Sequence, residues 1–405
     1  MFKYSALLSL CLVALSVSAS PIASPKVTIP IAARFNSGGN IVAADRARIA
    51  AIKSKDYGAA PAAHKRASYS IAVTNDAVSY TTPVGVGSPA TEYTLLIDTG
   101  SSNTWVGAYQ AYVKTSTSVD TGDAVAVTYG SGSFSGTEYY DTVTISSSLV
   151  IPNQSIGVAD TSEGFGEGID GIIGIGPTIL TEGTVTGVTE VPTVSDNLYS
   201  QGTISTEAVG IFFAPTTSES DTNGELTFGG ADTTKYTGTL AYVPLTTTEP
   251  ASYYWGINQD ITYNGATILA TTAGIVDTGT TLVYLASNAY DSYVSATGAK
   301  LDANTGLLKV TSAQYAALKP LDFVIGGTTY ALTANGQIWP RSLNTYIGGT
   351  TGSIYLIVNN LGTPSGEGLD FINGYTFLER FYSVFDTTTQ QLGFATTSYT
   401  TATTN

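Results

Sequence analysis

The sequence has almost none of the residues that usually carry nucleophilic or metal chemistry. Its 405 residues include one cysteine, Cys11, and one histidine, His64. Because both lie near the N-terminus, the rest of the chain can form no disulfide, no Cys–His pair, no Ser–His–Asp triad and no histidine-ligated zinc site. We therefore expect neither a metal nor a cofactor, and any catalysis must use carboxylates, hydroxyls or lysines.

Charged residues are also scarce, at 12% of the chain, whereas hydrophobic residues make up 43%. This balance is typical of a folded protein with a sizeable core, and the length allows two or three domains. The 43 glycines and 26 tyrosines, together with many Thr and Ser, favour strands joined by tight turns, while long helices would need more Ala, Glu, Lys and Arg. The composition predicts a mainly β fold.

No run of about 20 apolar residues, the length that a membrane-spanning helix needs, occurs in the sequence. The most apolar stretch, Ala6–Val17, follows Lys3 and precedes small residues that suit cleavage after Ala19, which is the pattern of a signal peptide. The final residues are polar, so the hydrophobic tail of a lipid-anchor signal is missing. We predict a signal peptide over residues 1–19 and secretion to the extracellular space.

Basic and acidic residues are distributed unevenly along the chain. Residues 20–66 carry eight Lys or Arg against two Asp, whereas the chain beyond Arg66 carries seven basic and 29 acidic residues, a net charge of −22. An ordinary solvated charge pair would be one interpretation of Lys65-Arg66. A basic segment, however, can cover an acidic cleft electrostatically, and we call residues 20–66 the leader. We predict a propeptide over residues 20–66, cut after Arg66.

The chain beyond Arg66, called the body below, is strongly negative, and this charge limits the functions that the protein can have. It excludes a generic nucleic-acid-binding protein, which would need a basic surface. Crowded carboxylates repel one another at neutral pH, and the repulsion fades as they become protonated. The composition therefore favours a protein that works in acid.

One short motif occurs twice. The segments LLIDTGSSNTW (Leu95–Trp105) and AGIVDTGTTLVYL (Ala273–Leu285) each place Asp-Thr-Gly after an apolar strand. An ionised carboxylate at a buried strand end is costly unless hydrogen bonds or a shared proton compensate. A single Asp-Thr-Gly turn could occur by chance, but two matched copies in a chain without other nucleophiles indicate that Asp98 and Asp277 act together.

With this doubled motif, the sequence resembles the pepsin-like aspartic endopeptidases from about Ala67 to its end. The resemblance implies a bilobal fold of two β-barrel-like lobes that face each other across an active-site cleft, with one catalytic Asp from each lobe. Asp98 and Asp277 take those places. We predict lobes over residues 67–243 and 244–405.

The resemblance also gives roles to the neighbours of the two Asp. Thr99 and Thr278 are expected to hydrogen-bond to the opposite loop. Ser101 and Thr280 are expected to donate to the outer carboxylate oxygens, although simple satisfaction of turn groups would use the same hydroxyls. The supporting loop residues are therefore Thr99, Gly100, Ser101, Thr278, Gly279 and Thr280.

The segment VTYGSGSFSG (Val127–Gly136) resembles the flap of this family, a β-hairpin that closes over the substrate. Alone it would be an ordinary hairpin. Its substrate-binding residues would be Tyr129, Gly130 and Ser131, with Trp105 supporting Tyr129. Because Ser131 offers no carboxylate, we expect no preference for lysine in the substrate.

Two further segments match the family in order. DGIIGIGP (Asp170–Pro177) and FINGYTFLERFYSVFD (Phe371–Asp386) resemble the segments that pass behind the first and the second catalytic loop. We expect Ile169, Ile172 and Thr281 to line a specificity pocket. A plain core position is the alternative for both isoleucines.

Within the family, the sequence is most similar to the polyporopepsin type of basidiomycete fungi. SSNTW, VTYGSGSFSGTEY and SGEGLDFINGYTFLERFYSV look like that subgroup, as does the lack of cysteine in the body. Asn373-Gly374-Tyr375 stands where Leu-Gly-Asp is commoner in the wider family. This change removes a carboxylate outside the catalytic pair and bears on the packing of the second lobe.

The resemblance implies an endopeptidase in which one carboxylate activates a water and the other donates a proton to the scissile carbonyl. The expected partners are protein and peptide substrates, with large hydrophobic residues around the scissile bond, and pepstatin-type inhibitors. We expect no nucleic-acid or membrane partner. A monomer is expected, and a retroviral-style homodimer disfavoured, because one chain holds both halves of the site.

Two rival functions are compatible with an acidic, secreted β protein. A glycosidase also uses two carboxylates, but it needs neither paired Asp-Thr-Gly turns nor a flap. An inactive pepsin-like binding protein would keep the fold, although both catalytic loops are intact here. The tripeptide NQS also makes Asn153 a candidate glycosylation site.

Overall fold

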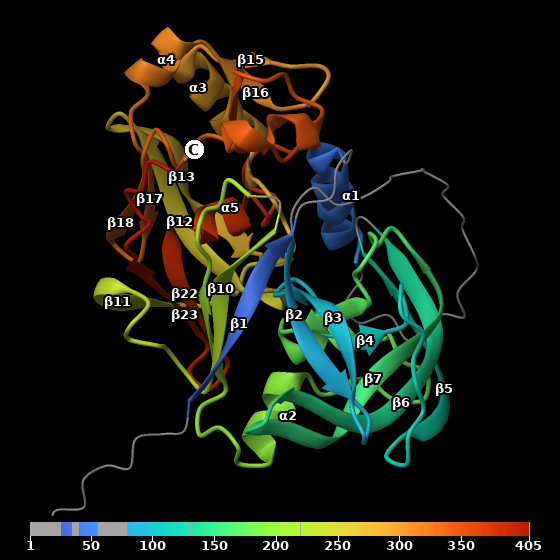
Figure 1. Ribbon diagram of the computed structural model, residues 1–405. Helices are drawn as coiled ribbons and strands as arrows, with labels where there is room; N and C mark the ends of the chain where they lie inside the picture. The colour runs from blue at the N-terminus through green and yellow to red at the C-terminus, as the bar shows by residue number, and fades with distance from the viewer. Residues whose placement is uncertain (1–25, 35–39, 56–78, 130–131, 219, 405) are drawn as a thin grey trace, which may run out of the picture.

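The computed structural model describes residues 26–34, 40–55, 79–129, 132–218 and 220–404. The predicted signal peptide, the Lys65-Arg66 pair and the flap residues Gly130 and Ser131 lie outside these residues. The described chain is mainly β and bilobal, as predicted. Figure 1 shows one lobe drawn mostly in teal to green and the other in yellow to red.

One large sheet runs through both lobes. Its described strands are β1 (Val27–Arg34), β2 (Ser79–Val86), β3 (Thr91–Asp98), β4 (Trp105–Val106), β5 (Val119–Thr128), β6 (Ser133–Ser146), β7 (Leu149–Glu163), β8 (Gly171–Gly174), β9 (Ala208–Phe212), β10 (Ser220–Phe228), β11 (Thr237–Pro244), β22 (Phe381–Asp386) and β23 (Gln391–Thr396). Their spatial order is β11-β23-β22-β9-β10-β1-β2-β3-β8-β4-β7-β6-β5, and β2 also pairs with β6. Strand β1 comes from the predicted propeptide. The predicted lobe boundary near Val243 falls within β11, and it stays a prediction.

The second lobe has its own sheets. The larger contains β12 (Gly256–Tyr263), β13 (Ala266–Val276), β14 (Val283–Leu285), β17 (Leu321–Ile325), β18 (Thr328–Leu332), β20 (Val358–Asn360) and β21 (Phe371–Asn373). Its order is β18-β17-β12-β13-β21-β14-β20. The smaller sheet contains β15 (Lys300–Leu301), β16 (Leu308–Val310) and β19 (Ile354–Leu356) in the order β15-β16-β19.

The same strand arrangement surrounds each Asp-Thr-Gly loop. Asp98 ends β3, which pairs in parallel with β8, and β8 pairs antiparallel with β4. In the other lobe, β13 leads into Asp277 and pairs in parallel with β21, which pairs antiparallel with β14. The sequence repeats its motif because the fold repeats this arrangement.

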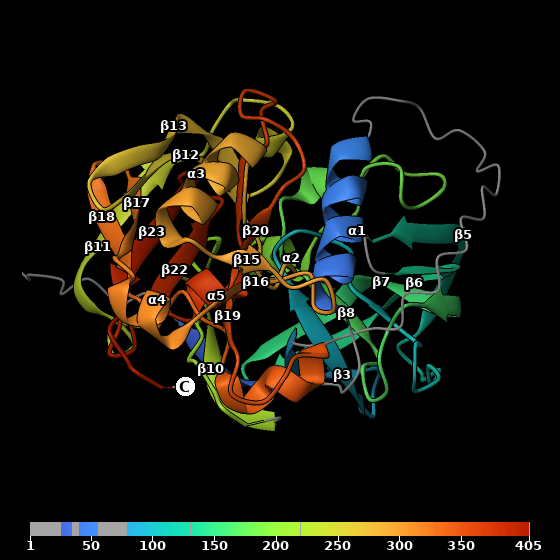
Figure 2. The same cartoon turned by 90° about the horizontal axis from the view of Figure 1, so that it is seen from above.

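Helices are few in the described residues. The α-helices are α1 (Ile41–Ser54), α2 (Val194–Ser200), α3 (Ser287–Thr297), α4 (Ser312–Ala317) and α5 (Tyr375–Leu378), and the 3₁₀ turns are η1 (Thr178–Thr181), η2 (Ala251–Tyr253) and η3 (Arg341–Ile347). Helix α1 begins after Asn40, whose side chain accepts a hydrogen bond from the backbone N–H of Ala43 (3.0 Å). Figure 2 shows α1 between the two lobes.

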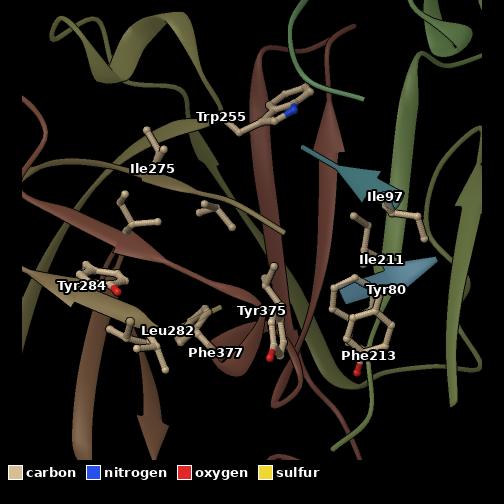
Figure 3. Close-up of a cluster of buried hydrophobic side chains, with 14 of the residues drawn as sticks. Tyr80, Ile97, Ile211, Phe213, Trp255, Ile275, Leu282, Tyr284, Tyr375 and Phe377 are labelled. Carbon is tan, nitrogen blue, oxygen red and sulfur yellow. The ribbon is translucent and has the colours of Figure 1, made fainter. Parts of the chain in front are cut away.

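Buried aromatic side chains join the lobes beneath the two loops. Tyr80 of β2 stacks on Phe213 with ring centroids 3.6 Å apart, and it meets Tyr375 edge-on at 5.8 Å. Figure 3 shows these rings together with Trp255, Ile97 and other members of the core. The core therefore extends from one lobe into the other and gives the two loops a common base.

Candidate active site

Reciprocal hydrogen bonds join the two Asp-Thr-Gly loops. The backbone N–H of Thr99 donates to Thr278 Oγ1 (3.0 Å), and that of Thr278 donates to Thr99 Oγ1 (2.9 Å). The hydroxyl of Thr99 donates to the backbone carbonyl of Val276 (3.4 Å). The hydroxyl of Thr278 donates to the backbone carbonyl of Ile97 (3.0 Å). Each loop is thereby fixed against the other.

The carboxylates of Asp98 and Asp277 have no solvent exposure. Ser101 Oγ donates to Asp98 Oδ2 (2.6 Å), and Thr280 Oγ1 donates to Asp277 Oδ2 (2.5 Å). These hydroxyls occupy equivalent positions in the two loops. They compensate part of the cost of burying the carboxylates and orient both groups.

Two glycines let the loops approach each other closely. The backbone N–H of Gly100 donates to Asp98 Oδ1 (2.9 Å), and that of Gly279 donates to Asp277 Oδ1 (3.0 Å). A Cβ added to Gly100 would lie 2.6 Å from Asp277 Oδ1, and one added to Gly279 would lie 2.5 Å from Asp98 Oδ1. A side chain at either position would therefore push the opposite carboxylate away.

Arg48 of α1 fills the space between the two carboxylates. Its Nη2 atom lies 2.5 Å from Asp98 Oδ1 and 2.8 Å from Asp277 Oδ1, and its Nε atom lies 2.6 Å from Asp277 Oδ2. Burial disfavours the charge of this guanidinium, but Asp277 and Asp98 outweigh burial and raise the pKa of Arg48 well above its usual value. The site is therefore closed by an ion cluster with one cation and two carboxylates.

Asp45 makes a second contact between α1 and the second loop. It is buried, and it accepts hydrogen bonds from the backbone N–H groups of Thr281 (2.9 Å) and Leu282 (3.0 Å). Burial raises the pKa of Asp45 to about 7, although the two N–H donors act in the opposite direction. Thr281, predicted to line a specificity pocket, thus contacts α1.

Two lysines near the end of α1 attach it to both lobes. Lys53 Nζ donates to Thr363 Oγ1 (2.8 Å), and Lys55 Nζ donates to the carbonyl of Leu180 (2.6 Å). The sequence predicts a basic leader over an acidic cleft, but no local pattern in it singles out Asp45, Arg48 or these lysines. Only the charge excess of residues 20–66 pointed toward them.

Aromatic rings support the flap hairpin at Tyr129. Trp105 is fully buried and stacks on Phe134 at 4.2 Å, and its ring centroid lies 6.4 Å from that of Tyr129. Phe165 meets Trp105 at 4.8 Å and Tyr129 at 5.8 Å, in both cases edge to face. Phe165 was not predicted from the sequence, where it is the one aromatic residue of the glycine-rich segment EGFGEG.

The structure also describes the predicted pocket residues Ile169 and Ile172 and the predicted glycosylation site Asn153. Ile172 lies opposite Trp105 in the pairing of β8 with β4, and both Ile172 and Ile169 are buried. A cavity of about 50 Å³ lies among Arg48, Tyr129 and neighbouring residues, whereas ligand pockets usually measure about 300–1,000 Å³. Arg48 and Ile52 of α1 line this cavity. Asn153 is exposed on β7.

Comparison with known proteins identifies the family. A family model described as "Eukaryotic aspartyl protease" matches residues 79–397. The chain belongs to this family. The aspartyl protease is 65% identical to polyporopepsin of Irpex lacteus over 83% of its own length and 99% of that relative. It is 32% identical to pepsin A of Suncus murinus over 78% of its length and 81% of that relative.

A solved structure agrees with these relatives. The crystal structure of an aspartic proteinase from Irpex lacteus matches the aspartyl protease with a TM-score of 0.81 and 56% identity, covering 94% of this chain and 100% of that chain. The resemblance predicted from the sequence is confirmed, and the protein is an aspartic endopeptidase of class EC 3.4.23. Among the described residues, no helix is long and apolar enough to cross a membrane.

Proposed function

We propose that this aspartyl protease is made as a secreted, inactive precursor and that its mature form cleaves proteins in acid, with Asp98 and Asp277 as the catalytic pair. The observation that carries the proposal is the guanidinium of Arg48 bound to both carboxylates. A water and a substrate carbonyl must take that place during catalysis. The arginine excludes both while the leader is attached.

The proposed chemistry is general acid and base catalysis. Two carboxylates held this close share a proton in acid, because two full charges would repel. The ionised carboxylate takes a proton from a water, which attacks the peptide carbonyl, while the protonated carboxylate donates to the carbonyl oxygen. The tetrahedral intermediate then collapses with proton transfer to the leaving amine.

The surroundings of the pair favour extended, hydrophobic peptides. The flap hairpin can hold a substrate as an added strand and exclude water from it. Trp105, Phe165 and Ile172 give this region an apolar lining, so we expect large hydrophobic residues around the scissile bond. Pepstatin-type inhibitors should bind in the same place. A monomer suffices, because one chain supplies both carboxylates.

Acid provides a route to activation. When both carboxylates become protonated, Arg48 loses its ionic partners and remains as a buried, uncompensated cation. The docked leader is then destabilised, and cleavage near Lys65-Arg66 removes it. A processing protease that recognises the dibasic pair would give the same product at neutral pH. Secretion through the predicted signal peptide would expose Asn153 to glycosylation.

The test is cleavage of casein by the processed protein from acidic to neutral pH, with and without pepstatin. Asp98→Asn and Asp277→Asn should each lower kcat by at least about 1,000-fold, because each variant removes either the acid or the base. Asp291→Asn, which changes an exposed carboxylate on α3, is the matched control and should keep full activity.

Each result decides between the proposal and its rival. Acid-limited cleavage that pepstatin and either Asn variant abolish supports the proposed pair. Folded, processed protein without cleavage at any pH would favour an inactive binding protein. Cleavage that resists pepstatin would place the active site elsewhere.

A further inference from the structure

Two buried amide side chains contact each other behind the second catalytic loop. Gln259 of β12 and Asn373 of β21 are 1% and 0% exposed. Gln259 Nε2 donates to Asn373 Oδ1 (3.2 Å), and Asn373 Nδ2 donates to Gln259 Oε1 (2.9 Å). We call these two residues the amide pair. Their contact spans 114 residues of sequence, and nothing in the proposed chemistry uses it directly.

The amide pair is connected to the loop through the backbone. The N–H of Asp277 donates to the carbonyl of Asn373 (3.1 Å), and two residues later the N–H of Tyr375 donates to the carbonyl of Thr280 (2.9 Å). Between them, a Cβ on Gly374 would collide with the carbonyls of Leu282 and Thr280. The segment that begins at Asn373 therefore lies against the full length of the catalytic loop.

The first lobe offers an internal comparison for Gln259. Gln259 lies opposite Thr272 of β13, and Val84 lies opposite Tyr93 of β3. Thr272 and Tyr93 each precede the Asp of their own loop by five residues. Val84 is thus the counterpart of Gln259 in the first lobe, and it is fully buried.

Asn373 has a counterpart as well. It lies opposite Val276, and Ile173 of β8 lies opposite Ile97. Val276 and Ile97 each immediately precede the Asp of their own loop. The first lobe therefore places two apolar side chains, Val84 and Ile173, where the second lobe places the amide pair. The lobes share the strand arrangement but differ in the chemistry behind the loop.

We propose that the amide pair positions Asp277 against Asp98, and this inference rests on the proposed catalytic role of the two Asp. Apolar contacts have no preferred direction and tolerate small shifts of one strand against another. Two reciprocal hydrogen bonds between amides are satisfied in one relative placement only. Gln259 thereby fixes Asn373, and Asn373 fixes the backbone of Asp277. Gln259 and Asn373 are positioning residues, which touch neither the substrate nor the reacting atoms.

The test measures kcat, KM and the thermal midpoint of unfolding for the mature parent protein and for three mature variants. Asn373→Leu leaves the amide of Gln259 buried without its partner, so the midpoint should fall by roughly 2–6 °C. The double variant Gln259→Met/Asn373→Leu replaces both amides by apolar groups of similar shape, and its midpoint should stay close to that of the parent. The exchanged pair Gln259→Asn/Asn373→Gln keeps an amide contact.

Stability and activity should separate in the double variant. We expect its kcat to fall about 10- to 100-fold while KM changes less than about twofold, because the reacting groups are displaced but the substrate surface is intact. Two carboxylates that lie farther apart repel less, so the pH range in which the pair holds one proton should narrow. The active pH range of the double variant should narrow with it. The exchanged pair should recover part of kcat.

A matched control makes an equal change in the first lobe. Val84→Ile/Ile173→Val redistributes apolar volume at the equivalent positions and should leave kcat and the pH range unchanged. A double Gln259 and Asn373 variant with parental kcat and pH range would overturn the inference and leave the amide pair as core packing. An inactive parent in the same assay would overturn the proposed function, and this inference with it.

Discussion

Arg48 meets the two carboxylates in a way that a lysine could not. Its Nε and Nη2 atoms reach three carboxylate oxygens at 2.5 to 2.8 Å, because a guanidinium presents several N–H donors in one plane, whereas an ammonium is a point charge. A buried ion cluster depends on all its members, since removal of one leaves the others charged and unpaired. The stability of the docked leader should therefore depend strongly on this one side chain.

Replacing Arg48 with methionine should release the inhibition without cleavage of the leader. Two unpaired carboxylates beneath α1 would disfavour docking by about 3 kcal/mol. We expect the unprocessed Arg48→Met chain, with Lys65 and Arg66 changed to alanine, to cleave a peptide substrate about 10- to 100-fold faster than the same chain with Arg48. Initial rates on intact protein, verified by mass spectrometry, give the measurement.

Arg46 provides the control on the same helix. It is exposed, so Arg46→Met removes the same charge from the leader without touching the carboxylates. The Arg46 variant should stay inhibited. Equal rates for the two variants would mean that net charge, rather than the contact of Arg48, holds the leader in place.

Among the structural elements, the flap hairpin of β5 and β6 depends on rings outside itself. The backbone N–H of Tyr129 donates to the carbonyl of Gly132 (2.7 Å), which closes the hairpin near its tip. Trp105 and Phe165 then support the ring of Tyr129 from the body of the first lobe. The resting position of the flap is thus set by aromatic contacts that a Gly-Ser-rich hairpin cannot provide alone.

Phe165→Ala should weaken substrate binding more than it slows chemistry. The variant removes edge-to-face contacts with both Trp105 and Tyr129, which are worth about 0.5–1.5 kcal/mol each. We expect KM to rise about 10-fold and kcat to fall less than about threefold, measured on a peptide at acidic pH. Tyr109→Ala, at a side chain that is 62% exposed, should change neither constant. A loss confined to kcat would contradict the supporting role of Phe165.

Helix α1 contains one group that opposes release in acid. The pKa of Asp45 is raised by burial to about 7 in the docked leader, above the ordinary value of 3.8. The docked state therefore binds this proton more tightly than the released state. Its contribution to docking is fully present below 3.8 and is lost as the pH rises through 7. Titration of Asp45 therefore cannot drive the proposed release in acid.

The sequence predicted those parts of the site that are encoded locally. Asp98 and Asp277 could be proposed because each follows an apolar strand within a short motif. Trp105 and Tyr129 were proposed from the resemblance of short local segments to the family. The bilobal fold followed from the family resemblance. Arg48 could not be chosen among eight basic residues, because its contact depends on the phase of α1 and on where β1 enters the large sheet.

Contacts between residues far apart in the chain could not be predicted from the sequence either. The sequence showed that Asn373 departs from the commoner family pattern, but its partner Gln259 lies on another strand 114 residues away. The large sheet also crosses from one lobe to the other, and β11 pairs with β23. A boundary between lobes therefore has no local signature in the chain.

At the scale of the whole molecule, the body contains buried carboxyl groups apart from the proposed catalytic pair. Burial raises the pKa of Glu138 to about 7, although the hydroxyl of Ser155 donates to it. Burial also raises the pKa of Glu379 to about 7, and Tyr80 joins Glu379 to the other lobe by a hydrogen bond of 3.0 Å. Glu207 is only partly buried, and partial burial together with a hydrogen bond to Asp196 raises its pKa to about 8.

These shifts set the direction of the pH dependence of stability. An unfolded glutamate has a pKa near 4.5, so the folded protein binds more protons than the unfolded chain between about pH 4.5 and 8. The free energy of unfolding is therefore highest below this window and falls as the pH rises through it. Groups as buried as Glu138 and Glu379 can each contribute on the order of 3 kcal/mol to the fall. We therefore expect the mature chain to lose stability as the pH rises toward neutrality.

Glu138→Gln tests this origin of acid stability. A glutamine keeps the acceptor for Ser155 but carries no charge. The thermal midpoint of the mature variant should therefore fall less steeply between about pH 5 and 8 than that of the parent. By about pH 8 the variant should have lost about 2–3 kcal/mol less unfolding free energy than the parent. Glu190→Gln makes the same substitution at an exposed position of the same lobe and should leave the slope unchanged. If both variants flattened the slope equally, general repulsion within the acidic body, rather than the buried carboxyl, would govern the loss of stability.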